Sequence, residues 1–351
     1  MVSDELRAPR LSICIATYNR GKFISNSLDV ILGQMVPGIE IVVVDGASTD
    51  NTSDVMEAYS AEHEKINYYR EEINSGVDCD FDKAVTYAKG EYCWLLTDDD
   101  LLLPGALAKV LLAIEAKPEL VVVNAEVRNT DLLKTLEDRR LKTIGNIQYG
   151  KGDAEKFFSY AANYLSFIGC VVIRRECWLS RNREAYYGSL FIHVGVIFQD
   201  PPIESVLILS EPMITIRYGN AMWTPRSFEI WMFKWPRLIW SFPGFTDEAK
   251  QSVCRAEPWR NIKTLIYHRA SGAYSVAEYR KFLSTQSSGM LRVLSYFVGL
   301  FPAKLANVLV VIYFAWFKKQ EKMVMYDLLG SRHATGLSRL MARWFNVREM
   351  T

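Results

Sequence analysis

The 351-residue sequence has little cysteine, and none of its six cysteines forms a CxxC pair. This excludes a dense disulfide framework and favours reduced thiols in a cytosolic setting. The sequence also lacks an excess of charge of either sign, because its net charge at pH 7 is +1. We therefore expect no nucleic-acid partner. Internal repeats of solenoid length are absent as well.

Long apolar runs are equally scarce. The first residues, MVSDELRAPR, contain no apolar stretch of signal-peptide length, so we expect a protein that is not exported. The run Leu305 to Phe317, which includes Asn307, has only 13 residues, whereas about 20 are needed to span a bilayer. Pro302 and Lys304 break any longer helix. A membrane-spanning helix is therefore not expected.

The near-neutral charge hides an asymmetry. Residues 290–351 contain nine Lys or Arg and three acids, so this tail carries +6 and the rest of the chain carries −5. Four tryptophans also cluster in the segment 222–245, among other apolar and basic residues. Aromatic, apolar and basic residues together are typical of helices that lie in a membrane interface. We predict an aromatic-rich helical region over 221–351 that associates with the membrane; a buried core helix or an oligomer interface is the alternative.

The segment from Leu11 to Glu126 alternates short apolar runs with stretches of helical period. The runs LSICIA, IEIVVVD, INYYR, YCWLLT and LVVVNAE predict strands. This pattern indicates an α/β fold with a mostly parallel, Rossmann-like nucleotide-binding sheet. Residues 127–150 are predicted to be a loop. A helix, the strand CVVIRR, a short helix over 189–198 and the strands VLILS and MITIRY continue the same layer to about residue 220.

Three carboxylates, Asp98, Asp99 and Asp100, directly follow a predicted strand and precede a helix that starts with Pro104. Acids crowded at this edge of a parallel sheet repel one another unless a cation neutralises them, and oxygen ligands suit Mg²⁺ or Mn²⁺. Helix capping explains one aspartate but not three in a row. The run predicts a site for a metal or for a charged substrate.

A second polar cluster, Asp45 to Asp50, follows the predicted strand IEIVVVD. Glycine permits a close turn there, and Asp45 and Ser48 can hydrogen-bond a ligand at the sheet edge. An ordinary turn, with Asp50 capping the next helix, is the alternative. The cluster becomes informative together with Thr17, Tyr18 and Asn19, which stand at the end of the first predicted strand.

Taken together, the segments ATYNR, VVVDGASTDNT, NSG and AKGEYCWLLTDDD resemble the inverting glycosyltransferase family 2, which has the GT-A fold. The run that ends in Asp100 resembles the DXD motif of that family, and the nearest likeness is to bacterial O-antigen sugar transferases such as abequosyltransferases. The resemblance implies a GT-A domain over 1–220, with a nucleotide-sugar half over 1–126 and an acceptor half over 127–220. It implies that Asp98 contacts the ribose or the sugar and takes part in catalysis, and that Asp99 and Asp100 hold the divalent ion. The implied nucleotide-sugar-binding residues are Thr17, Tyr18, Asn19, Asp45, Ser48, Asp50, Asn74, Gly76, Lys83 and Asp98.

The chain departs from the family at two places. Where many members have an Arg-Asn pair, this chain has Asp80 and Lys83; Lys83 can face the diphosphate or be an ordinary surface lysine. The acid pair that usually provides the general base is missing, and His193 is the titratable residue at that position. His193 can act as the base, contact metal or phosphate, or be a core residue. Glu184 and Asp200 are weaker candidates for the base, and Arg174 and Arg175 can contact phosphate or end a strand.

These observations predict a metal-dependent inverting glycosyltransferase that uses Mg²⁺ or Mn²⁺ and a UDP-, dTDP- or CDP-linked sugar. The expected acceptor is a lipid-linked (polyprenyl diphosphate) saccharide in bacterial surface polysaccharide synthesis, with the enzyme peripheral on the cytoplasmic face of the cell membrane. A polyprenyl-phosphate glycosyltransferase and a catalytically silent sugar-nucleotide-binding scaffold are the alternatives. A sugar-nucleotide pyrophosphorylase is disfavoured, because no Gly-rich, Arg-containing loop follows the first strand.

Overall fold

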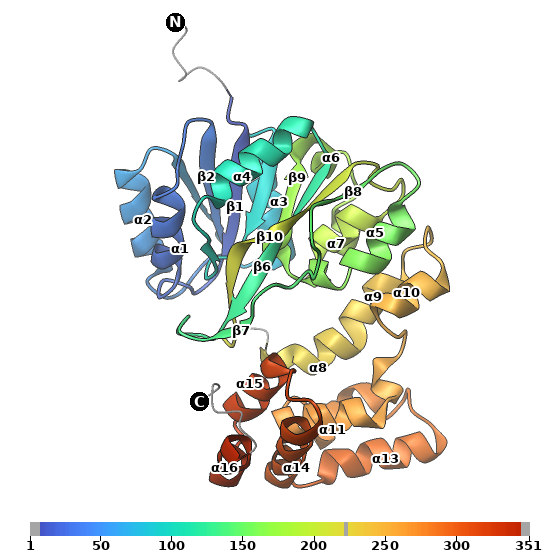
Figure 1. Ribbon diagram of the computed structural model, residues 1–351. Helices are drawn as coiled ribbons and strands as arrows, with labels where there is room; N and C mark the ends of the chain where they lie inside the picture. The colour runs from blue at the N-terminus through green and yellow to red at the C-terminus, as the bar shows by residue number, and fades with distance from the viewer. Residues whose placement is uncertain (1–7, 221–223, 345–351) are drawn as a thin grey trace, which may run out of the picture. The chain divides into compact units, whose positions relative to one another are not determined.

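The computed structural model describes residues 8–220 and 224–344, which form two compact units (Figure 1). The first is an α/β unit of residues 8–127, 138–217 and 242–253. The second is mostly helical and takes up residues 128–137, 218–220, 224–241 and 254–344. The α/β unit thus includes a short segment from the predicted C-terminal region, and the predicted division at residue 220 stays a prediction.

One twisted sheet forms the centre of the α/β unit, in the strand order β3-β2-β1-β4-β9-β6-β10-β5. The strands β3, β2, β1 and β4 pair in parallel, and β9 pairs antiparallel with both β4 and β6. The bounds are β1 Leu11–Thr17, β2 Ile39–Asp45, β3 Ile66–Arg70, β4 Tyr92–Leu96, β5 Leu101–Leu102, β6 Leu120–Arg128, β9 Val171–Arg174 and β10 Val206–Arg217. Every residue of β1, β2 and β4 is buried, so both faces of the sheet are covered there. The prediction of an α/β fold with a mostly parallel sheet is confirmed.

Helices cover this sheet along its length (Figure 1). Their bounds are α1 Ile24–Leu32, α2 Thr52–Glu62, α3 Val77–Tyr87, α4 Ala106–Ala113, α5 Ala154–Ala161, α6 Arg175–Leu179, α7 Ile192–Phe198 and α10 Asp247–Val253. The first helix buries Ile24, Leu28 and Ile31, as the helical period of the sequence predicts. Helix α3 packs on β1 and β2, which places its side chains beside the ends of those strands.

Two predictions about the segments after β6 need correction. Residues 127–150 are not a simple loop, because they contain the short strands β7, Thr135–Glu137, and β8, Ile147–Tyr149. The segments VLILS and MITIRY are not separate strands but parts of the single strand β10. Its two ends pair antiparallel with different partners, β8 and β5, so the strand continues through Pro212.

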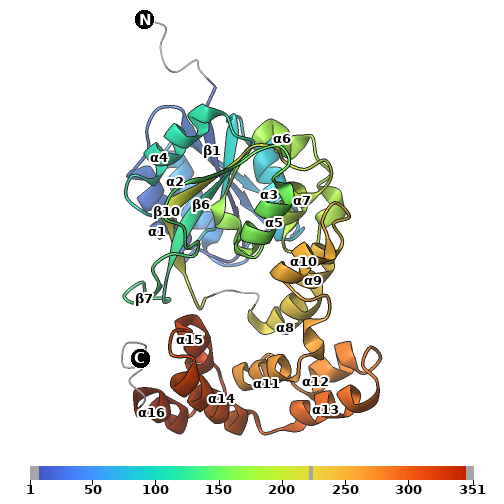
Figure 2. The same cartoon turned by 45° about the vertical axis from the view of Figure 1, so that its right-hand side comes forward.

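The helices of the second unit are drawn in Figure 2, and they enclose two clusters of buried apolar side chains. Its helices are α8 Ser227–Glu229, α9 Trp235–Trp240, α11 Ile262–Ser271, α12 Val276–Glu278, α13 Gly289–Leu300, α14 Ala303–Phe317, α15 Lys322–Gly330 and α16 Gly336–Trp344. The π-helical turns Ile230–Lys234 and Tyr279–Leu283 interrupt this pattern. The prediction of a C-terminal helical region is confirmed.

The tryptophan-rich segment 222–245 contributes to cores rather than to an exposed apolar face. Phe228, Met232 and Trp235 are buried, and Trp231 packs against the cluster around Phe228. The buried-core alternative therefore describes this segment better than an interfacial one. Trp223, the first of its four tryptophans, lies outside the described residues.

Within the described residues, every helix taken singly falls short of the length and hydropathy needed to cross a membrane. The pair α13 and α14 passes that test only when joined, and the two helices are bent by 101° at the break between them.

Candidate active site

The carboxyl ends of β1, β2 and β4 lie at one edge of the sheet. In the parallel register Thr17 lies opposite Asp45, and Leu96, the last residue of β4, lies opposite Ile15. Ligands of open α/β sheets bind outside this edge. The structure therefore brings together the polar loops that the sequence predicts to form one site, with Thr17 buried and Tyr18 half-buried at the end of β1.

Side-chain hydrogen bonds lock the loops after β1 and β2 together. Asn19 Oδ1 accepts hydrogen bonds from the backbone N–H groups of Thr49 (2.7 Å) and Asp50 (3.2 Å). Ser48 Oγ accepts one from the backbone N–H of Asn19 (2.8 Å). Asn19 has φ of 55°, in the left-handed region that asparagine tolerates better than most residues. Asn19 and Ser48 thus build the turn in which the resemblance places the nucleotide.

Asp45 is buried at the end of β2, and two donors fix its carboxylate. Its Oδ1 accepts from the Ser48 backbone N–H and its Oδ2 from the Tyr68 hydroxyl, both at 2.8 Å. Each carboxylate oxygen has a second lone pair, so the oriented group retains capacity to accept from a ligand N–H. Tyr68, in β3, is a site residue that the sequence analysis missed. The sequence showed only that it belongs to a strand, and not that its hydroxyl meets Asp45.

Asp50 has contacts that organise the start of α2. Its Oδ1 accepts from the Thr52 hydroxyl (2.5 Å) and the Thr52 backbone N–H (3.0 Å), and its Oδ2 accepts from the Gly21 N–H (3.3 Å). Partial burial raises the pKa of Asp50, but the hydrogen bonds from Thr52 outweigh it and lower the pKa below the ordinary value. These contacts fit the turn-and-capping alternative; a role toward the nucleotide stays a prediction.

The three consecutive aspartates are 7%, 8% and 3% exposed, which is low for carboxylates. Arg20 from the first loop reaches two of them, with Nε 3.5 Å from Asp98 Oδ1 and a terminal nitrogen 3.4 Å from Asp99 Oδ2. Asp100 accepts hydrogen bonds from the Thr97 hydroxyl and from the backbone N–H of Arg217 (2.7 Å). Asp98 and Asp99 thus face the guanidinium of Arg20, whereas Asp100 is tied to the end of β10.

The aspartates carry more negative charge than their surroundings neutralise. Burial, followed by the charge of Asp99, raises the pKa of Asp98 to about 7, although Arg20 lowers it. The same two causes raise the pKa of Asp100 well above its ordinary value. A divalent cation at these oxygens removes this repulsion, so the donor set fits Mg²⁺ or Mn²⁺.

The described residues contain no group of three or more His, Cys, Asp or Glu side chains arranged as a ready-made metal cage. This agrees with the chemistry of Mg²⁺, which proteins usually bind through one or two carboxylates together with substrate phosphates. Asp99 and Asp100 are therefore suited to hold a cation jointly with a bound diphosphate.

Arg217 is a second residue that the sequence analysis missed. Its Nε donates to the Asp99 carbonyl oxygen (2.9 Å) and a terminal nitrogen donates to Asn26 Oδ1 (2.8 Å). Its guanidinium also stacks on the ring of Phe23, as does that of Arg20. The two arginines thus link the loops around the aspartates to the same aromatic ring.

The segment before α3 contributes Asn74, Gly76 and Lys83. Asn74 Oδ1 accepts from the Gly76 N–H (2.9 Å), and Gly76 has φ of 90°, which glycine adopts without strain. Lys83 Nζ lies 2.5 Å from Glu71 Oε2 and 3.1 Å from Ser75 Oγ. Lys83 is therefore already ion-paired, and a contact to the diphosphate stays a prediction.

Asp80, in α3, has its carboxylate against Gly46 in the turn after β2. A Cβ atom at Gly46 would lie 2.5 Å from Asp80 Oδ2, so glycine is needed at 46 to admit this carboxylate. Burial raises the pKa of Asp80 to about 6, against a hydrogen bond from Ser75 and the charge of Lys83. Asp80 thus adds a second carboxylate beside Asp45.

His193, predicted as the general base, lies in the interior in α7. Its Nε2 is 2.6 Å from the Leu165 carbonyl oxygen and its ring lies beside that of Phe191. Complete burial lowers its pKa to about 4, although the hydrogen bond to Leu165 opposes this. A neutral imidazole shut off from solvent fits the core-residue alternative, so the structure disfavours His193 as base.

The burial of His193 predicts a pH-dependent stability. Its pKa falls from 6.5 in the unfolded chain to about 4 in the folded one, so between these values only the unfolded state binds the proton. The free energy of unfolding should therefore decrease as the pH falls through this window, by up to about 1.4 kcal/mol per pH unit for this group. His193→Gln keeps a donor and does not titrate. Urea unfolding at several pH values should show a shallower slope for this variant, and equal slopes would contradict the assignment.

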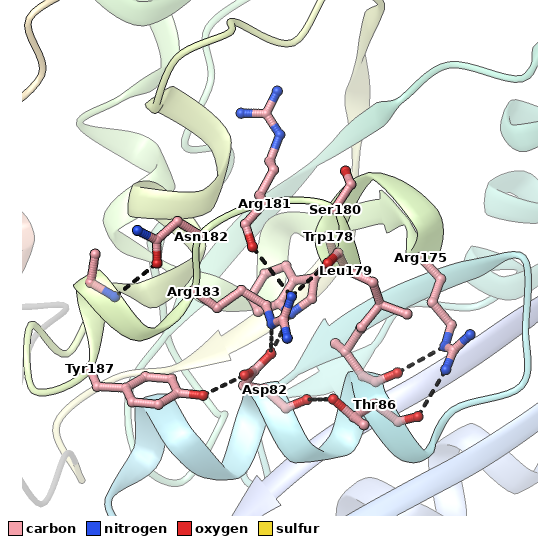
Figure 3. A network of polar contacts seen from close by, with 12 residues as sticks. Asp82, Thr86, Arg175, Trp178, Leu179, Ser180, Arg181, Asn182, Arg183 and Tyr187 are labelled. Atoms are coloured by element: carbon pink, nitrogen blue, oxygen red, sulfur yellow. Dashed lines mark hydrogen bonds and ion pairs between the residues drawn. The ribbon is translucent and has the colours of Figure 1, made fainter.

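Acids on the opposite face of α3 anchor the segment that holds Tyr187 and His193. Asp78 accepts from the backbone N–H groups of Leu190 (2.8 Å) and Ile192 (3.0 Å). Asp82, one turn later, accepts from Trp178 Nε1 (2.8 Å) and from the Tyr187 hydroxyl (2.5 Å), and its Oδ1 lies 2.8 Å from Arg183 Nε (Figure 3). Helix α3 therefore joins the predicted nucleotide half to the predicted acceptor half.

The remaining candidates lie apart from this cluster. Arg174 and Arg175 donate to backbone carbonyls, Arg174 to those of Lys117 and Pro118 and Arg175 to those of Val85 and Thr86. They begin and brace α6 at the opposite end of β4, because β9 runs antiparallel to it. Strand-end bracing therefore accounts for both arginines. Glu184 and Asp200 are exposed.

Comparison with known proteins agrees with this arrangement. Residues 12–177 match glycosyl transferase family 2. The chain is 26% identical over 223 residues to abequosyltransferase RfbV of Salmonella typhimurium, covering 60% of this chain and 67% of the relative. It is 30% identical over 104 residues to the GalNAc(5)-diNAcBac-PP-undecaprenol beta-1,3-glucosyltransferase of Campylobacter jejuni, covering 29% of this chain and 34% of the relative.

The fold has a counterpart among solved structures. The crystal structure of S. aureus TarS 1-349 in complex with UDP superposes with a TM-score of 0.52 at 14% sequence identity, covering 96% of this chain and 88% of that structure. At this identity the likeness concerns the fold, and it confirms the GT-A architecture. Residues 12–177 thus match glycosyl transferase family 2, and the polar loops at the carboxyl edge of their sheet agree with this similarity.

Proposed function

We propose that the protein transfers a sugar from a UDP-, dTDP- or CDP-linked donor to a lipid-linked saccharide, with inversion at the anomeric carbon and with Mg²⁺ or Mn²⁺. In this proposal it acts in bacterial surface polysaccharide synthesis at the cytoplasmic face of the cell membrane. The single observation that carries the proposal is the meeting of two carboxylate loops, after β2 and after β4, at one edge of the sheet.

The first loop is suited to the nucleotide. Asp45 is oriented by Ser48 and Tyr68, and it can accept a hydrogen bond from a pyrimidine ring N–H. Thr17 and Asn19 border the same turn. Asp80 adds a second carboxylate there, so donors on the base and ribose, rather than further acceptors, are the groups that this pocket selects.

The second loop is suited to the diphosphate. A cation held by Asp99 and Asp100 neutralises the charge that develops on the leaving diphosphate. Asp98 is then available to contact the ribose or the transferred sugar, and Arg20 adds positive charge beside the same oxygens.

The acceptor assignment rests on relatives. The name of the Campylobacter relative includes an undecaprenol-linked saccharide, and RfbV is named as an abequosyltransferase. An inverting reaction also needs a general base on the face opposite the leaving group. Buried His193 is poorly placed to meet a substrate hydroxyl, so the base is expected among residues that solvent reaches.

The proposal is tested by supplying the full chain with UDP-, dTDP- and CDP-sugars, Mn²⁺ or Mg²⁺, and short-chain prenyl diphosphate saccharides. We expect release of nucleoside diphosphate from one class of donor, stimulated by the lipid-linked acceptor and stopped by EDTA. The anomeric configuration of the product, read by NMR, should be opposite to that of the donor. Nucleotide release that no acceptor stimulates, or a product of retained configuration, would contradict the proposal.

A further inference from the structure

The helical unit exposes three apolar stripes, one on each of α13, α14 and α16. The exposed large side chains recur every three to four residues, so each set lies on one face of its helix. They are Met290, Val293, Leu294, Phe297 and Leu300 on α13; Leu305, Leu309, Tyr313, Trp316 and Phe317 on α14; and Leu337, Leu340 and Trp344 on α16. In both views α13, α14 and α16 run along one side of the helical unit (Figures 1 and 2).

The distribution of side-chain size across these helices is the reverse of that in an ordinary surface helix. The exposed face of helix α14 carries leucines and aromatic rings, whereas the side chains that it turns into the unit are smaller: Ala303, Ala306, Asn307, Val308, Val311 and Ala315. Helix α13 buries Ser295 and Gly299, and a Cβ atom at Gly299 would lie 3.1 Å from backbone atoms of Ser275 and Val276. The small residues allow close packing inside, and the large apolar ones are left for an external contact.

The charges on α13, α14 and α16 themselves are all positive, and the next acid along the chain is Glu321. No acid occurs from Gly289 to Gln320, a stretch that contains Arg292, Lys304, Lys318 and Lys319, all of them exposed. Helix α16 likewise contains Arg339 and Arg343 and no acid. An apolar face bordered by exposed cations is complementary to a bilayer that contains anionic lipid.

We propose that the exposed faces of α13, α14 and α16 form a membrane-docking surface, which lies flat on an anionic bilayer with its aromatic and aliphatic side chains among the acyl chains. One side of each helix is packed in the unit, so the stripe on the other side meets the bilayer along the length of the helix. This inference adds a partner to the proposed function and does not depend on the sugar-transfer reaction.

A second copy of the chain is a less suitable occupant. In a twofold interface the same patch meets itself, so Arg292, Lys304, Lys318 and Lys319 of one copy would approach those of the other. The stretch offers no acid to compensate them, and like charges across an interface cost free energy. Anionic lipid headgroups supply the missing counter-charge.

The test is co-sedimentation of the full chain with vesicles of phosphatidylglycerol and phosphatidylcholine, compared with phosphatidylcholine alone. The wild-type protein should bind the anionic vesicles, and salt should weaken the binding. The variant F297S/L309S/F317S should bind at least about 100-fold more weakly, because three apolar side chains no longer enter the bilayer. The variant R292Q/K304Q/K318Q, which changes only exposed cations, should lose about 100-fold on anionic vesicles.

The matched control is I73S/L112S/I144S, which removes three equally exposed apolar side chains from the α/β unit and should bind vesicles like the wild type. Circular dichroism shows whether each variant folds. Wild-type protein that does not sediment with anionic vesicles, or charge and apolar variants that bind normally, would overturn the proposal. A wild-type dimer in sedimentation velocity that F297S/L309S/F317S dissociates would assign the surface to a second copy instead. Donor hydrolysis measured without vesicles reports on the proposed reaction separately.

Discussion

Asp99→Asn is expected to lower metal-dependent turnover by about 10³-fold. Asparagine keeps the size of the side chain and removes the charge that holds a divalent cation against the leaving diphosphate. A bound metal contributes several kcal/mol of transition-state stabilisation, and about 4 kcal/mol corresponds to that factor. The measurement is kcat/KM for the donor sugar at saturating Mn²⁺.

The same substitution should leave the fold intact or stabilise it. The charge of Asp99 is one of the two main causes that raise the pKa of Asp98 to about 7, so its removal relieves repulsion among buried carboxylates. Arg20 keeps Asp98 as a partner in the variant. Lost activity with an unchanged or raised unfolding midpoint therefore separates a catalytic role from a structural one.

Asp54→Asn provides the control, because Asp54 is an exposed acid in the first turn of α2. It should change neither turnover nor its dependence on Mn²⁺. Normal turnover of Asp99→Asn in the presence of a chelator would contradict the metal assignment and leave the aspartates as a binding site for a charged substrate.

The sheet and the position of the site could be predicted from the sequence for a physical reason. Buried parallel strands need continuous apolar runs. The first carboxylate after each run, Asp45 in IEIVVVD and Asp98 after YCWLLT, therefore shows where the strand ends. Because parallel strands end at the same edge, Asp45 and Asp98 are expected near each other from these local patterns alone.

Contacts between segments distant in the chain could not be predicted in this way. Arg217 reaches Asp99 and Asn26 because β10 pairs with β5. The local sequence of β10 does not predict that pairing. The sequence suggests His193 as the base because it stands where the family usually has its acid pair. Its burial results from the packing of α7, which the sequence does not show. The side chains of Tyr68 and Asp80 became recognisable as site residues only through the turns they contact.

The helical period of α3 explains how its acids serve two different sites. Side chains four residues apart share one face of a helix, so Asp78 and Asp82 both turn toward residues 178–192. Asp80 projects to the other side, toward Gly46. One short helix thus supplies a carboxylate to the predicted nucleotide pocket and two anchors to the neighbouring segment.

Asp82→Ala is expected to destabilise the α/β unit by about 2–4 kcal/mol. The change leaves the buried indole N–H of Trp178 without its acceptor and the guanidinium of Arg183 without its ion pair (Figure 3). A buried donor left without an acceptor costs about 1–3 kcal/mol. Arg183 adds less, because its side chain is 26% exposed and also donates to the carbonyl oxygens of Leu179 and Arg181. The Tyr187 hydroxyl loses its 2.5 Å hydrogen bond as well.

The measurement is urea unfolding followed by the fluorescence of the tryptophans, together with hydrogen exchange over residues 178–192. Tyr187→Phe is the graded control, because it removes one hydrogen bond and should cost about 1 kcal/mol. Asp82→Asn should fall between the two, since an amide oxygen still accepts from Trp178 but no longer pairs with Arg183.

If α3 anchors this segment, exchange should accelerate in residues 183–192 while the strands β1 and β2 keep their protection. A variant Asp82→Ala with unchanged stability and unchanged exchange would mean that the packing around Trp178, and not the carboxylate, holds the two halves of the unit together.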